Sequence, residues 1–141
     1  MWNLFWPVAL VVLSNCFYNI CTKSTPGGAN AFLSLAVTYL TAAALAVILF
    51  LCGHRDGSLA AEFGKLNWTS VALAVSVVAL EFGYISLYRA GWKVNTGSLV
   101  ANITLACALV LVGALLYHES VSPRQLLGMA VCMAGLILIS G

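Results

Sequence analysis

An acidic residue stands in the middle of one of the most apolar stretches of the chain. Glu81 lies within the run SVALAVSVVALEFGYISLYRAGW, which covers residues 70–92. An acidic side chain at the centre of a membrane helix costs about 2.5–3.5 kcal/mol on insertion scales, and such residues usually face a cavity or a partner along a transport pathway. A carboxyl there holds a proton or a cation, but not easily both. The position therefore indicates proton-for-cation exchange, with a structural hydrogen bond to a neighbouring helix as the alternative.

Two tyrosines follow this acid at helical spacing. Tyr84 and Tyr88 come three and seven residues after Glu81, so all three share one face of a helix. Aromatic rings next to a carboxylate make a good site for an organic cation. We therefore expect both tyrosines to bind the substrate, with packing or an interface between helices as the alternative.

Polar residues also recur at helical spacing in other apolar runs. Amide and hydroxyl side chains of this kind either contact a solute or form hydrogen bonds between membrane helices. Bonding between helices is the favoured interpretation for the stripe of Ser34, Thr38 and Thr41. Substrate binding is the interpretation for Asn15, Asn19, Ser98 and Asn102.

The composition indicates the class of protein. Of the 141 residues, 62% are hydrophobic and 7% are charged, and the mean hydropathy is +1.03. A soluble domain averages about 25% charged residues, so we expect an integral membrane protein. The net charge of +2 and the absence of a Lys/Arg-rich patch from the sequence give no reason to expect a nucleic-acid partner.

The sequence contains no motif typical of an enzyme. There is no Ser/His/Asp arrangement, Gly-rich phosphate loop or HExxH motif. The five cysteines form no CxxC pair and are interpreted as small apolar side chains. We expect no enzymatic activity, no metal and no cofactor, and a proton gradient as the driving force. Solvated loop charge, not metal binding, is the interpretation of His54, Asp56, Glu62 and His118.

Five apolar stretches approach the length of about 20 residues that a membrane helix needs. Ser122, Pro123 and Gln125 predict a capping box and a proline at the start of the last helix. Small residues in that helix predict close packing or a dimer contact, at Gly128, Ala130, Ala134 and Gly135. The fold class is all-α, with residues 1–141 forming one transmembrane domain. The predicted spans are 2–22, 31–52, 68–92, 96–117 and 123–140.

The basic residues divide evenly between the two sides of the predicted domain. Orientation normally follows an excess of Lys and Arg on the cytoplasmic side. An even division predicts insertion in both orientations and an antiparallel homodimer, in which two copies of Glu81 would share one depth and titrate as a pair. The alternative is an even count by chance, with a partner or the N-terminal amine setting the orientation. The two sides carry Arg55, Lys65 and Arg124 against Lys23, Arg89 and Lys93.

The end of the chain resembles the closing segment of the drug/metabolite transporter superfamily. The segment LLYHESVSPRQLLGMAVCMAGLILISG shares its acidic helix end, its polar capped turn and its Gly-rich last helix. NCFYNICTK resembles the end of the first helix of that domain, with Lys23 at its basic terminus. The likeness covers nearly the whole chain as one five-helix EamA-type unit. The matching residues are Glu119, Ser122, Gln125, Gly128 and Gly135.

This resemblance implies an assembly. Members usually carry two such units fused, so a single unit implies a dimer that rebuilds a ten-helix transporter with the units inverted. The related small multidrug resistance proteins are antiparallel homodimers with a glutamate in the first helix. Here the first predicted helix carries Asn15 and Asn19, and the acid Glu81 lies in the third.

Together these observations predict a multi-pass transporter in the cell membrane, either inner or plasma. It would be a proton-coupled exporter of a small organic solute by alternating access, with Glu81 exchanging proton and substrate. A cationic or zwitterionic solute is preferred on charge complementarity. Two other functions stay open: a lipid-carrier flippase or a subunit of one, and a membrane scaffold without transport activity.

Overall fold

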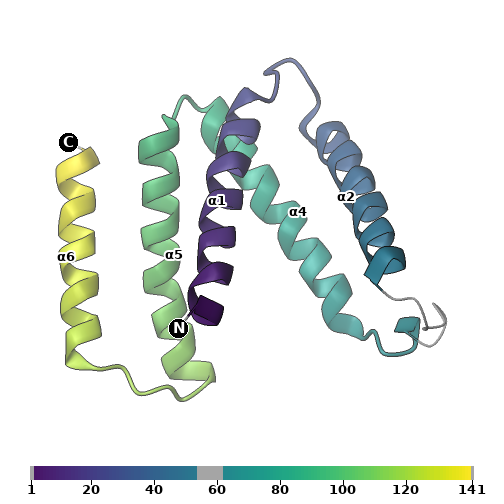
Figure 1. Cartoon of the computed structure of the whole chain (residues 1–141). Coiled ribbons are helices and arrows are strands. Elements are labelled where there is room, and N and C mark those ends of the chain that lie inside the picture. The colour runs from purple at the N-terminus through teal and green to yellow at the C-terminus, as the bar shows by residue number, and fades with distance from the viewer. Residues whose placement is uncertain (1, 54–61, 141) are drawn as a thin grey trace. The chain divides into compact units, whose positions relative to one another are not determined.

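The computed structural model describes residues 2–53 and 62–140, and the regular structure of these ranges is helical (Figure 1). This confirms the predicted all-α class and the order of the five predicted helices. His54, Arg55 and Asp56 lie outside the described residues. The helices are α1 (Trp2–Ser24), α2 (Ala31–Gly53), α4 (Trp68–Arg89), α5 (Val94–Leu116) and α6 (Pro123–Ser140).

Four of these helices are long and apolar enough to cross a membrane: α1, α2, α4 and α5. α6 is shorter, with 18 residues. At about 1.5 Å per residue it rises about 27 Å, which is less than the hydrocarbon thickness of about 30 Å. The predicted fifth span therefore depends on residues that flank α6. The four longer helices fit a membrane protein.

Apolar side chains cover the outside of the helices instead of filling an interior. Leu115 is 76% exposed and Leu138 is 84% exposed. Water disfavours such a surface, whereas hydrocarbon does not. The exposure pattern therefore agrees with helices that are surrounded by lipid. In the part of the chain that the structure describes, the buried apolar side chains are Ala31, Leu35, Ile85, Tyr88 and Leu136.

The helices fall into two compact units. α2 and α4 form one unit, and α1, α5 and α6 form the other. In the first unit, the core consists of Ala31 and Leu35 from α2 and Ile85 from α4, with Tyr39 packed against them. In the second unit, α5 and α6 pack against each other.

Side-chain caps fix where α2, α4 and α6 begin, and before α4 the Asn67 Oδ1 accepts a hydrogen bond from the N–H of Thr69 (2.9 Å). Oδ1 of Asn30 accepts hydrogen bonds from the N–H groups of Phe32 (2.9 Å) and Leu33 (3.2 Å) and so caps α2. Before α6, the N–H of Ser122 donates to Oε1 of Gln125 (2.8 Å), and the N–H of Gln125 donates to Oγ of Ser122 (3.3 Å). These reciprocal bonds confirm the predicted capping box.

The structure corrects the predicted bounds of the third and fourth spans. α4 ends at Arg89 instead of Trp92, and α5 begins at Val94 instead of Thr96. Gly91 has a φ of 96°, a backbone conformation that stops a helix and that glycine adopts without steric cost. Both predicted bounds lay two to three residues too far along the chain, because hydropathy does not register the backbone conformation of Gly91.

A basic side chain ties a helix end to a turn in each unit. In the α2–α4 unit, Nη2 of Arg89 donates to the carbonyl oxygens of Pro26 (3.2 Å) and Ala29 (2.7 Å) in the turn before α2. In the other unit, Nζ of Lys23 at the end of α1 donates to the carbonyl oxygen of Trp92 (3.1 Å). These bonds satisfy carbonyl groups that the turns would otherwise leave without a helical partner.

Candidate functional site

The predicted site residues lie in both units. Glu81, Tyr84 and Tyr88 belong to α4 in the α2–α4 unit. The polar residues predicted to bind substrate belong to α1 and α5 in the other unit. The structure therefore brings the candidates together as two separate sets, each within its own unit. The second set consists of Asn15, Asn19, Ser98 and Asn102.

Glu81 lies deep within α4, on the side of the helix that packs against α2. It follows Trp68 by 13 positions and precedes Arg89 by eight, which places it about 20 Å and 12 Å from the two helix ends. Its side chain is half-buried. Ile85, one turn further on, is 5% exposed and belongs to the core shared with α2. The carboxyl is therefore part of a contact between helices and far from a helix end.

Tyr39 of α2 is the neighbour of Glu81 that the sequence analysis missed. Its hydroxyl lies close enough to the Glu81 carboxyl to interact with it. This hydroxyl is buried, and in the described part of the chain it makes no hydrogen bond of standard geometry. The hydroxyl is a donor and the carboxylate an acceptor, so the two groups are complementary. The sequence carried one signal for this residue. Tyr39 lies in an apolar run, four positions after Leu35 and eight after Ala31, so it shares their face of the helix.

The two predicted tyrosines contact each other along the same face of α4. The ring centroids of Tyr84 and Tyr88 are 6.1 Å apart and the ring planes are inclined by 37°. Tyr88 is buried, whereas Tyr84 is half-buried. Tyr84 therefore presents more ring surface to a ligand, and Tyr88 supports it from the side of the core.

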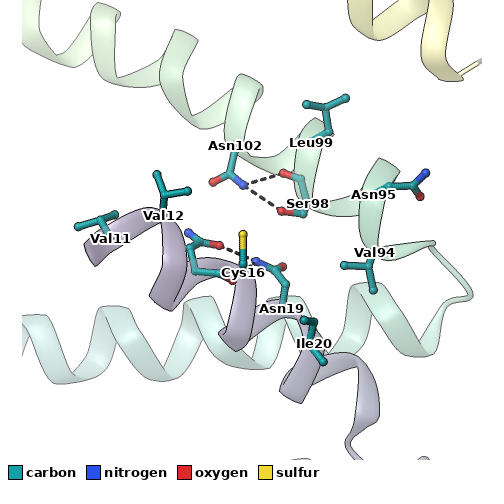
Figure 2. Close-up of a pocket in the computed structure, with 11 residues that line it drawn as sticks. Val11, Val12, Cys16, Asn19, Ile20, Val94, Asn95, Ser98, Leu99 and Asn102 are labelled. Carbon is teal, nitrogen blue, oxygen red and sulfur yellow. Dashed lines mark hydrogen bonds between the residues drawn. The ribbon is translucent and has the colours of Figure 1, made fainter. Parts of the chain in front are cut away.

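The four polar candidates of the second unit meet in one groove between α1 and α5, the asparagine groove (Figure 2). Its volume is about 580 Å³, within the range of about 300–1,000 Å³ that small-molecule sites occupy. The convergence matters because the residues come from helices far apart in the sequence. The other lining residues are Asn95 and the less polar Val11, Val12, Cys16, Ile20, Val94 and Leu99.

Hydrogen bonds in the asparagine groove run along each helix. Nδ2 of Asn19 donates to the main-chain oxygen of Asn15 (2.8 Å) and to its Oδ1. Nδ2 of Asn102 donates to the main-chain oxygen (2.8 Å) and to Oγ (3.1 Å) of Ser98 (Figure 2). These bonds orient the side chains on their own helix and do not join α1 to α5. Asn19 is 3% exposed, and so it is the most enclosed of the four.

The polar side chains of α2 form hydrogen bonds different from those predicted. The hydroxyls of Thr38 and Thr41 donate to the main-chain oxygens of Ser34 (3.0 Å) and Val37 (2.9 Å), one turn earlier in the same helix. Such bonds satisfy a hydroxyl without a second helix. The hydrogen bonding expected between helices is therefore replaced, for these two threonines, by bonding within α2.

The small residues of α6 make no close contact with the rest of the described chain. A Cβ atom placed on Gly128 or Gly135 would meet nothing within 4 Å, and Ala130 and Ala134 are exposed. Leu136, 8% exposed, is the buried apolar side chain of α6. Other described residues therefore do not pack tightly against these small residues, and their role in a dimer stays a prediction.

Glu119, one of the residues that carry the family resemblance, closes the turn after α5. Its N–H donates to the main-chain oxygen of Gly113 (3.0 Å), and His118 between them adopts a left-handed conformation with φ of 52°. The Glu119 side chain lies over Gly113, where an added Cβ would come within 2.7 Å of Oε2. Glu119 therefore has a structural role in the turn that ends α5.

The comparisons with known proteins add no assignment. No family model matches the chain, and neither the curated proteins nor the solved structures provide a match.

Proposed function

We propose that this protein is a secondary transporter that couples the movement of protons to the export of a small organic solute. The observation that carries the proposal is the position of Glu81. Its carboxyl lies about 12 Å or more from either end of an apolar helix, half-buried against α2 and beside a tyrosine hydroxyl. Ionisable groups in such positions usually belong to ion or proton pathways.

The chemistry follows from the low polarity of the surroundings. A carboxylate in hydrocarbon requires a compensating charge, which either a proton or a cationic solute supplies. The two therefore compete for Glu81, and release of one accompanies binding of the other. Tyr84 supplies ring surface for a cation, with the buried Tyr88 packed against it, and a cationic or zwitterionic solute is the preferred substrate. Motion of repeat-related halves about this depth would expose the carboxyl to each side in turn.

The proposal includes an antiparallel homodimer in the cell membrane. The even division of Lys and Arg between the two sides supports it, and so does the open space around Gly128 and Gly135 on α6. The resemblance of the last segment to EamA-type units of the drug/metabolite transporter superfamily is consistent with the same assembly. Each copy would contribute one Glu81, and the two carboxyls would titrate as a coupled pair.

Reconstitution into vesicles with an imposed pH gradient tests the proposal. Tetraethylammonium and a panel of larger organic cations serve as solutes, and proton movement is followed with a pH-sensitive dye inside the vesicle. Wild-type protein should accumulate at least one solute in a gradient-dependent way. Glu81→Gln should abolish this uptake, and Glu81→Asp should retain part of it.

The control is Glu62→Gln, which removes a carboxyl that lies 2.6 Å from Nζ of Lys65 outside the helices that could span the membrane. Its uptake should equal that of the wild type. Uptake by Glu81→Gln at the wild-type rate would refute the role of Glu81. Loss of assembly in Glu81→Gln, without transport by the wild type, would favour a scaffold. Movement of a labelled lipid between leaflets, without uptake of any solute, would favour a flippase.

A further inference from the structure

We propose that the asparagine groove binds an uncharged solute, or the uncharged part of a solute, that carries hydroxyl or amide groups. This assigns a chemical class of ligand to a site that is distinct in character from the Glu81 set. Only the role of this ligand in transport depends on the proposed function. Binding itself is measured without a proton gradient.

The lining of the groove excludes charge recognition. Among the described residues, those that line it include no Lys, Arg, His, Asp or Glu. A cation in the groove would lose its hydration without gaining a counter-charge, which is unfavourable. An uncharged ligand escapes this cost and retains the apolar contacts of Val11, Val12 and Leu99.

The polar groups in the groove retain hydrogen-bonding capacity after their internal bonds are made. The amide nitrogen of Asn102 is engaged by Ser98, which leaves its Oδ1 as an acceptor, and Figure 2 shows this oxygen directed away from Ser98. Both oxygens of Asn15 accept from Asn19, which leaves the Asn15 amide N–H groups as donors. The Ser98 hydroxyl accepts from Asn102 and keeps its own proton as a donor. In the described part of the chain, these remaining groups have no further protein partner.

Donors and an acceptor on facing sides of a groove match a specific ligand chemistry. A hydroxyl group both donates and accepts, and an amide group offers one donor and one acceptor next to each other. Asn15 on α1 supplies donors, while Asn102 on α5 supplies an acceptor. A polyol or an amide-bearing molecule satisfies both sides, whereas a purely apolar molecule satisfies neither.

The depth of these residues favours an occupant. Asn15 precedes Ser24 by nine positions, and Asn102 follows Val94 by eight, so each lies about 12–14 Å from the nearer helix end. Both side chains are exposed on the chain. Polar groups without partners at this depth are strongly disfavoured in hydrocarbon. A concave site of about 580 Å³ fits a small molecule.

Cys16 provides a reporter because it lines the groove and is a free thiol. The full-length protein, reconstituted in vesicles without a gradient, is treated with N-ethylmaleimide, and modification of each cysteine is followed by mass spectrometry. Mannitol and N-acetylglycinamide are the uncharged probes, and tetraethylammonium is the cationic probe. At least one uncharged probe should slow modification of Cys16 at saturation. Cys132, exposed on α6, is the internal control and should react at an unchanged rate.

Variants link the protection to the named groups. Asn102→Leu removes the acceptor and should raise the probe concentration for half-protection about 2- to 10-fold, the effect of one neutral hydrogen bond. Ser98→Ala should act in the same direction and serves if Asn102→Leu fails to fold. Ser76→Ala is the matched control, because its hydroxyl bonds to the Ala72 main-chain oxygen within α4 and lies in the other unit. It should leave protection unchanged.

Three outcomes would overturn the inference. Protection by tetraethylammonium but by neither uncharged probe would make the groove a cation site. Absence of protection, with oxidative cross-linking of Cys16 between two copies, would show that a second copy covers the groove. Absence of both protection and cross-linking would show that the groove has no ligand of the proposed class. Glu81→Gln should leave protection intact, so failure of proton coupling is distinguishable from failure of this proposal.

Discussion

Tyr39 of α2 lies beside Glu81 of α4, with its hydroxyl buried near the carboxyl and not in a hydrogen bond of standard geometry. The pair thus brings a hydrogen-bond donor of α2 next to an acceptor of α4. A charged carboxyl attracts the hydroxyl proton, whereas a protonated carboxyl does so less. The state of Glu81 is therefore expected to change the contact between α2 and α4.

Replacing Tyr39 with phenylalanine tests this relationship. The ring and its packing remain, but the donor is lost, so the charged form of Glu81 loses stabilisation. The midpoint of the pH dependence of solute uptake should therefore differ from that of the wild type. Tyr117→Phe, at an exposed position after α5, should leave the midpoint unchanged. An unchanged midpoint in Tyr39→Phe would mean that the hydroxyl does not act on Glu81.

Two glycine substitutions should have opposite effects on stability. Gly91 has a φ of 96°, so Gly91→Ala forces a side chain into a disfavoured conformation and should destabilise the protein by about 1–2 kcal/mol. Gly113 lies within α5, and there only the far end of the exposed Glu119 side chain stands in the way of a methyl group. Gly113→Ala should therefore be neutral or stabilise by up to about 1 kcal/mol.

Thermal unfolding in one detergent, followed by circular dichroism, measures both glycine variants. Glu119→Ala combined with Gly113→Ala separates the gain in helix propensity from the displacement of the carboxylate. A strongly destabilised Gly113→Ala that the second substitution does not rescue would contradict this account of the turn.

The capping box before α6 should stabilise that helix through two coupled bonds. Ser122→Ala removes the side-chain acceptor for the Gln125 N–H, which keeps its bond of 3.0 Å to the Ser122 main-chain oxygen, and should cost about 0.5–2 kcal/mol. Gln125→Ala removes the acceptor for the Ser122 N–H and should cost less, because that group can bond to water instead. The double variant should cost less than the sum of the two, since the bonds hold each other in place. Strictly additive losses would indicate that the two caps act independently.

The orientation of the chain in the membrane should respond to a few charges. Lys65 and Arg124 lie on the same predicted side, and replacing both with alanine leaves one basic residue there against three on the other. The side with Lys23, Arg89 and Lys93 should then become cytoplasmic in most molecules. Reporter fusions at the C-terminus, active on only one side of the membrane, measure the proportion. A wild-type chain with a single orientation would refute dual topology.

Sequence patterns predicted the elements of this fold better than their contacts. The apolar runs gave the helices and their order, and the SVSPRQ segment gave the capping box, because both depend on neighbouring residues. The early end of α4 was missed because it depends on the backbone of Gly91 and not on hydropathy.

In the candidate site, too, the sequence predicted residues along one helix better than contacts between helices. Spacing along α4 predicted that Tyr84 and Tyr88 share a face, and their rings do contact each other. Tyr39 was not predicted. Its importance depends on the packing of α2 against α4, and the spacing of residues along α2 does not show which helix packs against it. Asn15 and Asn102 were singled out separately, and only the folded chain shows that they line the same groove.

As a proposed membrane span, the last helix would favour some bilayers over others. With 18 residues, its length of about 27 Å matches a thin bilayer better than one thickened by sterols or long acyl chains. In a thick bilayer the lipids next to α6 would have to compress. Under the proposed assembly, acyl-chain length would therefore influence how the chain sorts among membranes and how readily two copies associate.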